Sequence, residues 1–328
     1  MRARVVPALI ALVLAAAGCG SPSTPPSSVA VAPIEALPSG AQEATAAPVA
    51  ESADCGDREA SLRPDPLPAP GAMPPGSIMA AIAERGRLIV GVDQNTRPFG
   101  YRDPSTGQLE GFDIDVAREI ARAIFGDPKP GDPDRVDPRV VEASHREDAL
   151  KSGEVDVVVR TYSITCKRKQ SVAFSTTYFN AHQKILAVKG SGIDSAAALA
   201  GKRVCAATGT TSLEALLALE SKPKVFGVTS WTDCLVMLQQ GQVDAISTDD
   251  AVLAGLAAQD PNVELVGPSM DVEPYGVGIK LENEDLVRFV NGVLDEMRAD
   301  GTWNGLYDKD LLLALGPSPG PPKPRYRD

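Results

Sequence analysis

The sequence predicts an α/β protein built from two similar units, because one pattern of helix, glycine turn and strand occurs twice. Residues 147–159 read EDALKSGEVDVVV, and residues 234–247 read CLVMLQQGQVDAIS. A helix that leads through a tight glycine turn into a strand is the repeating unit of an open parallel sheet. The two strands end in polar runs, RTYS at 160–163 and STDD at 247–250. Since open α/β sheets bind ligands at the carboxyl ends of their strands, we interpret these ends as halves of one site.

The other elements follow from local patterns along the chain. Apolar residues at helical spacing predict an amphipathic helix at 111–126. Its apolar face is predicted to contain Ile114, Ala117, Ile120, Ala121 and Ile124. Short apolar and β-branched runs predict strands at 87–92, 183–189, 202–207 and 275–280. Further helices are predicted at 77–84, 212–220 and 284–299, with the segment 302–315 after them.

Composition argues against two classes of protein. The chain has 328 residues, of which 43% are hydrophobic, and a net charge of −11. This length is enough for two modest domains with hydrophobic cores. The acidic balance argues against nucleic-acid binding, which needs clustered Lys and Arg. Beyond the N-terminal region, no apolar run is long enough to predict a transmembrane helix.

The N-terminus has the features of an exported lipoprotein. Arg2 and Arg4 precede an apolar stretch of signal-peptide length, which is too short to span a bilayer as a permanent helix. Small residues then precede Cys19, as in the bacterial lipobox, although Ala16 stands where leucine is usual. We therefore predict a signal peptide at 1–18, lipidation of Cys19, and a lipid-anchored location on the extracytoplasmic face of the cell membrane. The alternative is an ordinary secreted protein in which Cys19 is incidental.

Two proline-rich segments flank the predicted folded region. Residues 19–75 are rich in Pro, Ser and Ala, a composition that buries little apolar surface. We predict a disordered tether here, which gives an anchored domain reach above the membrane. The segment 316–328 is predicted to be a disordered proline-rich tail.

Four cysteines besides Cys19 suggest two disulfides, because an even number is typical of exported, disulfide-bonded proteins. Four cysteines allow three pairings. Cys205 and Cys234 lie in the same half of the folded region, so we pair them, which leaves Cys55 with Cys166. We predict no metal site, because the sequence has no C-x-x-C motif and no paired His spacing. No cofactor is predicted either.

Six segments, in this order, carry a family resemblance: GFDIDVAREIA, ALKSGEVDVVV with SITCKRKQSVAFSTTYF, GKRVCAATGTTS, GQVDAISTDDAVL, YGVGIK and VNGVLDEMRADGTWNGLYDK. Together they resemble the polar amino-acid-binding proteins of ABC importers, family 3 of the solute-binding proteins. The resemblance covers residues 84–312 and is greatest to the actinobacterial glutamine- and glutamate-binding lipoproteins.

This resemblance implies a periplasmic-binding-protein-like fold, in which two α/β lobes are joined by two hinge strands and close over one amino acid. The hinges are expected near 178–186 and 273–280. Lobe 1 is expected at 76–180 plus 271–315, and lobe 2 at 181–270. The implied function is to bind a polar amino acid and deliver it to an ABC permease.

The resemblance also assigns residues to the ligand's α-carboxylate. Arg168 matches the family's clamp arginine and is expected to bind this carboxylate through its guanidinium fork. A turn that includes Thr208 opens the helix predicted after it, so backbone N–H groups are free there. These N–H groups, with the hydroxyls of Thr210 and Thr211, are expected to complete the carboxylate site.

A second group of residues is assigned to the ligand's ammonium. Asp249 matches the family's ammonium ligand. Thr161 and Ser163 are expected to add carbonyl and hydroxyl contacts. The neighbouring Asp250 is expected to be the N-cap of the helix that follows.

Specificity depends on charges expected near the ligand's side chain. Asp93 matches a position that often contacts the side chain, and a carboxylate there suits an amide or a cation. Arg160 stands where many relatives have a small residue, and Arg97 is expected nearby. A buried cation favours a ligand with an acidic side chain, and in that alternative Asp93 is the structural partner of Arg160. Thr96 replaces a frequent stacking aromatic, so a large ligand is not expected. We predict glutamate, aspartate, glutamine or asparagine, with arginine, histidine and lysine second.

Two rival functions need separate consideration. Some proteins of this fold are dehydratases, but the sequence offers only His145 and His182 and no Ser-His-Asp or Cys-His order, so we predict no enzyme. A sensor that docks on a membrane receptor and signals to a cytoplasmic kinase would have the same anchor, tether and lobes. The sequence alone does not separate this sensor from an importer protein.

Overall fold

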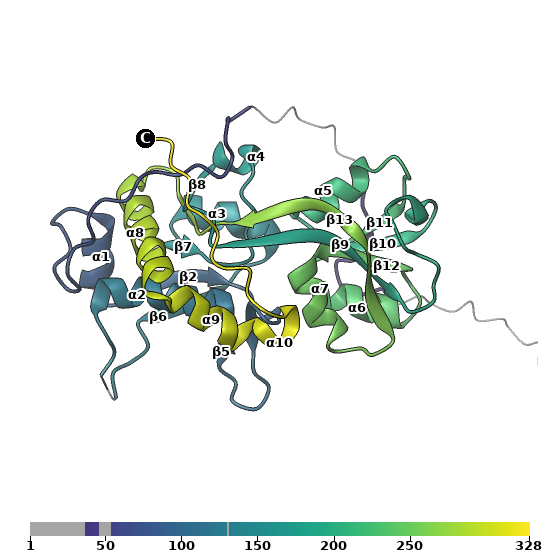
Figure 1. Cartoon of the computed structure of the whole chain (residues 1–328), viewed down its shortest axis with the longest axis horizontal. Coiled ribbons are helices and arrows are strands. Elements are labelled where there is room, and N and C mark those ends of the chain that lie inside the picture. Colours follow the sequence, from purple (N-terminus) through teal and green to yellow (C-terminus); the bar gives the residue numbers. More distant parts are fainter. Residues whose placement is uncertain (1–36, 46–53, 130) are drawn as a thin grey trace, which may run out of the picture. The chain divides into compact units, whose positions relative to one another are not determined.

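The computed structural model describes residues 37–45, 54–129 and 131–328 (Figure 1). Residues 37–328 form one compact unit. It contains two large hydrophobic cores, one around β2 (Leu88–Val92) and one around β10 (Arg203–Ala207). We call the corresponding parts lobe 1 and lobe 2. The predicted signal peptide and Cys19 lie outside the described residues.

Lobe 1 is built on a five-stranded sheet. β2 pairs in parallel with β6 and β7, and β14 pairs antiparallel with β7 and β8. The order is β6-β2-β7-β14-β8, formed by Val136–Val140, Leu88–Val92, Val157–Val158, Gly278–Lys280 and Val172–Phe174. A small sheet is formed by β3 (Asn95–Thr96), β4 (Gly100–Arg102) and β5 (Leu109–Glu110).

The helices of lobe 1 include the amphipathic helix that the sequence predicts near 111–126. The five residues predicted on the apolar face of α2 are all buried, which confirms that prediction. α3 ends at Gly153, which adopts the left-handed conformation that the predicted turn needs. The helices are α1 (Ile78–Arg85), α2 (Phe112–Phe125), η1 (Ala143–His145), α3 (Arg146–Ser152), α4 (Cys166–Lys169), α8 (Glu284–Asp300), α9 (Thr302–Asp310) and α10 (Leu312–Leu315).

Lobe 2 is built on a six-stranded sheet. β10 pairs in parallel with β11 and β12, as the repeated sequence pattern predicts. The order is β1-β11-β10-β12-β9-β13, formed by Gln42–Glu43, Lys224–Val228, Arg203–Ala207, Ala245–Asp249, Phe179–Val188 and Val263–Tyr275. The helices are η2 (Ala197–Leu199), α5 (Thr211–Ala218), α6 (Trp231–Gln239) and α7 (Asp250–Ala257).

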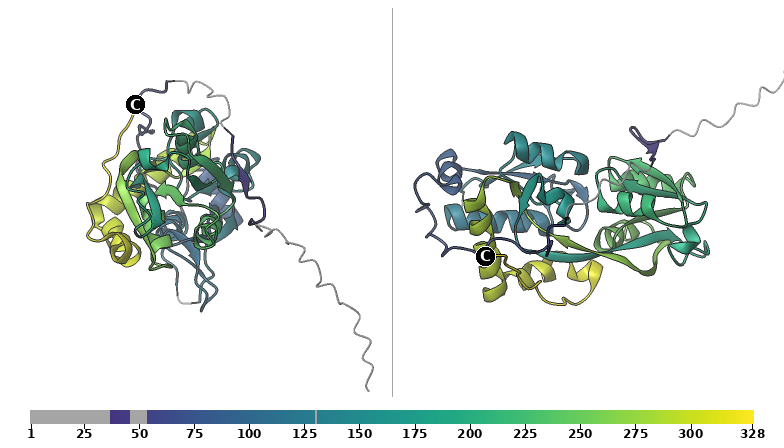
Figure 2. Two further views of the ribbon diagram at one scale, coloured as in Figure 1. Left: turned by 90° about the vertical axis from the view of Figure 1, so that its right-hand side faces the viewer. Right: turned by 90° about the horizontal axis from the view of Figure 1, so that it is seen from above.

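Two long antiparallel strands, β9 and β13, connect the lobes (Figures 1 and 2). Phe179 pairs with Tyr275 at one end, and both side chains belong to the core of lobe 1. At the other end Val188 pairs with Val263 beside the core of lobe 2. The lobe boundaries expected near residues 180 and 271 therefore fall inside these two strands.

The segment 19–75 was expected to be a disordered tether, but its described residues, 37–45 and 54–75, pack against the two lobes. β1 extends the sheet of lobe 2, and Ala41 and Ala44 pack against that core. Further along, Leu62 is buried in lobe 1, and Leu67 packs against α8 at Gly292. The prediction was wrong here because a proline-rich composition indicates only that a segment has little tendency to fold by itself. It does not show that a few of its apolar residues bury their surface against distant elements.

The segment 316–328, predicted to be a disordered tail, also packs against lobe 1. Tyr326 forms a parallel bridge with Ser61, and the tail's end carries Asp328, which pairs with Arg288 of α8 at 2.6 Å. The Nε of Arg298 donates to the carbonyl of Pro322 at 3.0 Å. Contacts between the N-terminal and C-terminal segments cannot be predicted from the composition of either segment alone.

Both predicted disulfides are present. Cys205–Cys234 joins β10 to α6 inside lobe 2, and Cys55–Cys166 joins the N-terminal segment to α4. The second bridge spans 111 residues of sequence. It fixes the end of the predicted tether to lobe 1.

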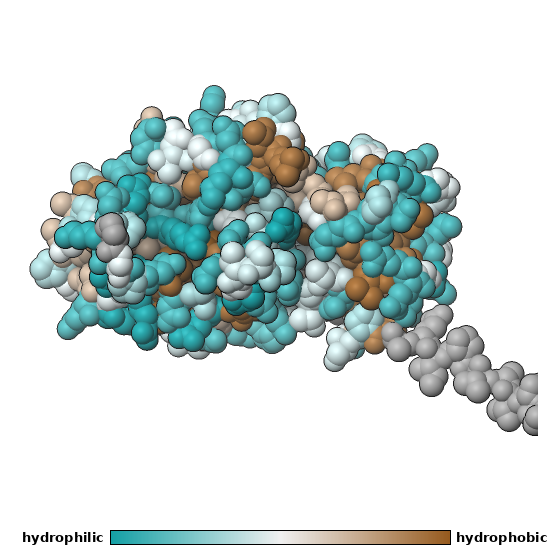
Figure 3. Space-filling view, turned by 90° about the horizontal axis from the view of Figure 1, so that it is seen from below, coloured by the Kyte–Doolittle hydropathy of each residue, from teal (hydrophilic) through white to brown (hydrophobic). Residues whose placement is uncertain are grey.

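The surface is mixed in character. On the face shown in Figure 3, hydrophilic residues predominate and hydrophobic residues lie in separate groups. Within the described part of the chain, no helix has both the length and the apolar character needed to cross a membrane.

Candidate functional site

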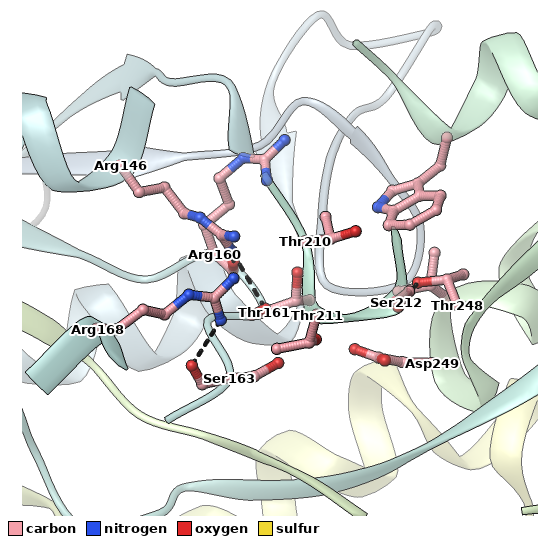
Figure 4. A pocket seen from close by; sticks show the side chains of 12 residues that line it. Arg146, Arg160, Thr161, Ser163, Arg168, Thr210, Thr211, Ser212, Thr248 and Asp249 are labelled. Atoms are coloured by element: carbon pink, nitrogen blue, oxygen red, sulfur yellow. Dashed lines mark hydrogen bonds between the residues drawn. The ribbon is translucent and has the colours of Figure 1, made fainter. Parts of the chain in front are cut away.

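A small buried cavity lies where the two lobes meet (Figure 4). Its volume is about 10 Å³, roughly the space of one water molecule. Lobe 1 contributes Arg146, Arg160, Thr161, Ser163 and Arg168, and lobe 2 contributes Thr210, Thr211, Ser212, Trp231, Thr248, Asp249 and Val252. The lobes are therefore closed on each other, and a larger molecule enters only when they separate.

Direct contacts between the lobes close this cavity. The carbonyl of Gly209 in lobe 2 accepts hydrogen bonds from Nη2 of Arg146 at 3.0 Å and Nη2 of Arg168 at 3.1 Å. A Cβ on Gly209 would lie 2.5 Å from the Cα of Ser144 in lobe 1. Gly255 of α7 approaches lobe 1 in the same way, since its Cβ would lie 1.8 Å from the carbonyl oxygen of Arg97. Glycine at both positions permits this close approach.

Arg168 lies on α4, whose N-cap Thr165 accepts a hydrogen bond from the Arg168 N–H at 3.1 Å. Its side chain is buried, and Nη1 donates to the carbonyl of Ser163 at 2.7 Å. The guanidinium also lies 4.9 Å from the ring centroid of Tyr162. Among the described residues it has no carboxylate partner. It is therefore available to an anion in the cavity.

Arg146 is a cavity residue that the sequence analysis missed. It is 3% exposed, and its guanidinium lies 4.2 Å from the Tyr162 ring centroid. Its hydrogen bonds go to backbone carbonyls, and it too has no carboxylate partner within the described residues. Burial, with the nearby charge of Arg168, holds its pKa well below the ordinary value. One signal was available: a cation at the first residue of a helix opposes the helix dipole.

Arg160 and Asp93 form a buried ion pair with an Nη2–Oδ2 distance of 2.7 Å. The Asp93 carboxylate also accepts from the N–H groups of Gln94 and Asn95 and from the hydroxyl of Thr96. All of its acceptor capacity is thus used within the protein. The alternative in which Asp93 is the structural partner of Arg160 agrees with this geometry, and Asp93 does not line the cavity.

Asp249 faces the arginines from lobe 2 (Figure 4). Its Oδ2 accepts a hydrogen bond from the hydroxyl of Tyr275, while its buried Oδ1 has no partner among the described residues. Burial, followed by the nearby carboxylate of Glu273, raises the pKa of Asp249 to about 8. An ammonium group placed in the cavity would satisfy Oδ1 and favour the ionised carboxylate.

The hydroxyl groups of lobe 2 are held by the helix start that the sequence predicts. Thr210 is the N-cap of α5, and its hydroxyl accepts from the N–H of Leu213 at 3.2 Å. Thr211 donates to Glu273 at 2.9 Å, and Ser212 donates to Thr248 at 3.3 Å. These side chains fix the wall of the cavity at the start of α5.

The strand end around Thr161 is held in an unusual backbone conformation. Thr161 has φ of 39°, which is uncommon for a β-branched residue. Oδ2 of Asp113 accepts from the Thr161 N–H at 2.8 Å, and Oδ1 accepts from the Tyr178 hydroxyl at 2.7 Å. Burial raises the pKa of Asp113 to about 6. This buried carboxylate on α2 therefore fixes the turn that presents Thr161 and Ser163.

Seven of the predicted site residues line the cavity, and three do not: Asp93, Arg97 and Thr208. Arg97 is exposed, with its guanidinium 4.1 Å from the Tyr101 ring centroid. Thr208 is held by the carbonyl of Val228, to which both its N–H and its hydroxyl donate. The sequence analysis missed Arg146, Ser212, Trp231, Thr248 and Val252. Thr248 and Ser212 adjoin predicted residues, whereas Trp231 gave no usable signal.

Asp250 differs from the expected N-cap role. α7 begins at Asp250, so Asp249 stands in the N-cap position. The Asp250 carboxylate instead accepts from its neighbour Ala251 at 2.8 Å and from the N–H of His182 at 3.0 Å. This contact ties α7 to the hinge strand β9.

Neither histidine lies in the cavity. His145 pairs with Glu142 at 3.3 Å, and His182 lies 3.5 Å from Asp250. The described residues contain no group of three or more His, Cys, Asp or Glu that could hold a metal ion. The cavity places the buried cations of lobe 1 opposite the buried carboxyl group of Asp249.

Comparisons with known proteins agree with this geometry. The family model described as bacterial extracellular solute-binding proteins, family 3, matches residues 88–311. The ABC transporter glutamine-binding protein GlnH of Bacillus subtilis is 36% identical over 232 residues, covering 70% of this chain and 83% of that protein. The glutamate-binding protein GluB of Corynebacterium glutamicum is 30% identical over 244 residues, covering 72% and 82%.

Solved structures give the same relationship. The solute receptor for L-cysteine of Neisseria gonorrhoeae has a TM-score of 0.68 at 29% identity, covering 73% of this chain and 95% of that one. An ancestral arginine-binding protein bound to arginine has a TM-score of 0.63 at 35% identity, covering 69% and 99%. The two-lobed α/β fold is thus shared with amino-acid-binding proteins. With the family model matched over more than half of its length, this chain belongs to family 3 of the bacterial extracellular solute-binding proteins.

Proposed function

We propose that this protein is an extracytoplasmic lipoprotein that binds an acidic amino acid or its amide and delivers it to an ABC permease. The candidate ligands are glutamate, aspartate, glutamine and asparagine. Binding takes place by closure of the two lobes over the ligand. The protein performs no covalent chemistry on it.

The arrangement of charge in the cavity carries this proposal. Arg146 and Arg168 are buried and have no ion-pair partner among the described residues, while Asp249 keeps one buried oxygen without a partner. Burying such charges without counter-charges costs free energy, which a ligand with both charges recovers. In the proposed complex, Arg168 binds the α-carboxylate and Asp249 binds the α-ammonium.

The second free cation supports an acidic side chain. Because Asp93 neutralises Arg160, Arg146 is the guanidinium left for a further group of the ligand. Its guanidinium lies 4.2 Å from the Tyr162 ring centroid and that of Arg168 lies 4.9 Å from it, and both arginines line the same cavity. A side-chain carboxylate fits a guanidinium better than an amide does, since charge-assisted hydrogen bonds are stronger. Among relatives, both glutamine-binding and glutamate-binding proteins occur.

A ligand bound in this way links the lobes. Arg168 belongs to lobe 1 and Asp249 to lobe 2, so one zwitterion contacts both walls. Since these contacts form together only in the closed state, the ligand shifts the equilibrium toward closure. The carbonyl of Gly209 adds a direct contact between the lobes, because both arginines donate to it.

The ligand is tested by calorimetric titration of the purified, ligand-stripped protein with each of the twenty amino acids. We expect 1:1 binding of L-glutamate or L-aspartate, tighter than binding of the matching amide. Tighter binding of an amide would show that Arg146 does not select an acidic side chain. The proposed binding function would still stand. No binding of any of the four would refute the proposed function.

The membrane partner needs a separate test. We expect a strain without this protein to lose uptake of the radiolabelled ligand, and we expect restoration by the wild type. A variant with Cys19→Ser should lose membrane association and much of the uptake. Unchanged uptake in the deletion strain, with an altered response to external amino acid, would favour the sensor role instead.

A further inference from the structure

The helix that carries Arg168 is too short to position itself. α4 has four residues, and an isolated turn of this length is not stable in water. Its location must come from contacts that its side chains make with other parts of the protein. Cys166 and Lys169 are three residues apart and therefore lie on the same face of the turn.

That face is held by an N-terminal segment, residues 54–62, which we call the brace. Cys166 forms a disulfide with Cys55. The ammonium of Lys169 donates to the carbonyl oxygens of Arg58 at 3.1 Å and Ala60 at 2.8 Å. One covalent bond and two charge-assisted hydrogen bonds thus join α4 to the brace.

The brace is in turn fixed to the body of lobe 1. The hydroxyl of Ser61 donates to the carbonyl of Phe174 in β8 at 2.7 Å and accepts from Asn291 of α8 at 2.9 Å. Leu62 is buried in the lobe 1 core. Asp57 pairs with Arg325 of the C-terminal segment at 3.2 Å. The brace therefore holds α4 at a fixed place relative to β8 and α8.

None of the brace residues lines the cavity. The brace also precedes residue 88, where the match to the family model begins. We propose that the Cys55–Cys166 disulfide and Lys169 are positioning residues for ligand binding, which act by holding Arg168 at the cavity wall. This inference rests on the proposed function, because it concerns the α-carboxylate contact of the same site.

The test is titration with L-glutamate of the purified full-length protein and three variants, with the melting temperature of each. The variants are Cys55→Ser with Cys166→Ser, Lys169→Met, and all three changes together. We expect each of the first two to raise Kd, the disulfide variant by about tenfold. Since both act through one brace, the combined variant should lose less than the product of the separate losses.

Lys189→Met is the matched control, because Lys189 of lobe 2 also donates to a backbone carbonyl, that of Pro261, away from the cavity. It should leave Kd unchanged. If the disulfide variant does not fold, Lys169→Met against Lys189→Met decides the matter: a raised Kd at an unchanged melting temperature supports positioning. An unchanged Kd in Lys169→Met overturns the inference while the wild type still binds. Failure of the wild type to bind glutamate, aspartate or their amides overturns the proposed function itself.

Discussion

The two walls of the cavity differ in charge. Lobe 1 presents three guanidinium groups, of which only Arg160 has a carboxylate partner among the described residues. Lobe 2 presents hydroxyl groups and Asp249, next to the further carboxylate of Glu273. Each wall alone therefore carries charge that is poorly compensated within its own lobe. This difference suits a ligand that carries both charges, as the free amino acid of our proposal does.

The largest expected effect comes from removing the lobe 1 clamp. Arg168→Ala should weaken binding of L-glutamate by about 2–5 kcal/mol, because it leaves the α-carboxylate buried without its charge partner. Calorimetric titration measures this loss. Arg122→Ala is a suitable control, since Arg122 is exposed and pairs with Glu119 on α2. If Arg168→Ala binds L-glutamate with nearly wild-type affinity, another residue binds the α-carboxylate.

A smaller but more selective effect is expected from the second cation. Arg146→Gln should weaken L-glutamate by about 1.5–3 kcal/mol, the usual contribution of hydrogen bonds to a charged group. L-Glutamine should lose less, because its amide makes no ion pair with Arg146. Titration of the same variant with both ligands gives the comparison directly. If both ligands lose the same binding free energy, Arg146 does not distinguish an acidic side chain from an amide.

The lobe 2 wall should make affinity depend on pH. With its pKa raised to about 8, Asp249 is neutral at lower pH in the ligand-free protein, whereas ammonium binding needs the carboxylate. Besides burial, the carboxylates of Glu273 and Asp250 raise this pKa, whereas the hydrogen bond from Tyr275 and the charge of Arg168 lower it. Affinity should therefore increase with pH up to about 8, by at most about tenfold per pH unit, or about 1.4 kcal/mol.

Titrations of L-glutamate between pH 6 and pH 8 measure this slope, and Asp249→Asn should flatten it. The stability of the ligand-free protein should change in the opposite direction. Since the folded state holds the Asp249 proton more tightly than the unfolded state, this group's contribution to the free energy of unfolding decreases as pH rises from 3.8 toward 8. A pH slope in the Asn variant equal to that of the wild type would assign the dependence to another group.

The smallest expected effect concerns the contact between the walls. Gly209→Ala should raise Kd by about tenfold, because its Cβ collides with Ser144 only when the lobes are closed. Gly190→Ala is the matched control, with a similar φ of +74° and no atom within 4 Å of its Cβ. The control shares the backbone strain and should keep the wild-type Kd. Similar Kd values for both variants would mean that the closed contact at Gly209 is not needed for binding.

Local patterns in the sequence were enough for much of the fold. The spacing of Ile114, Ile120 and Ile124 predicted the buried face of α2, and the paired glycine turns predicted two parallel α/β units. The polar strand ends predicted where a site would form. Seven candidate residues, with Arg168 and Asp249 among them, lie together at that place. Each of these inferences uses residues that are near one another in the chain or in a known motif.

Tertiary structure alone decided which charges remain available. Asp93 and Arg160 are far apart in sequence, and the fold pairs them. It also buries Arg146, which has no carboxylate partner among the described residues. The packing of residues 54–75 and 316–328 was likewise decided by contacts with distant elements, such as Leu67 on α8. The physical reason is the same in both cases. Composition and periodicity report what a segment prefers by itself, whereas burial and charge pairing depend on partners that the fold brings from elsewhere in the chain.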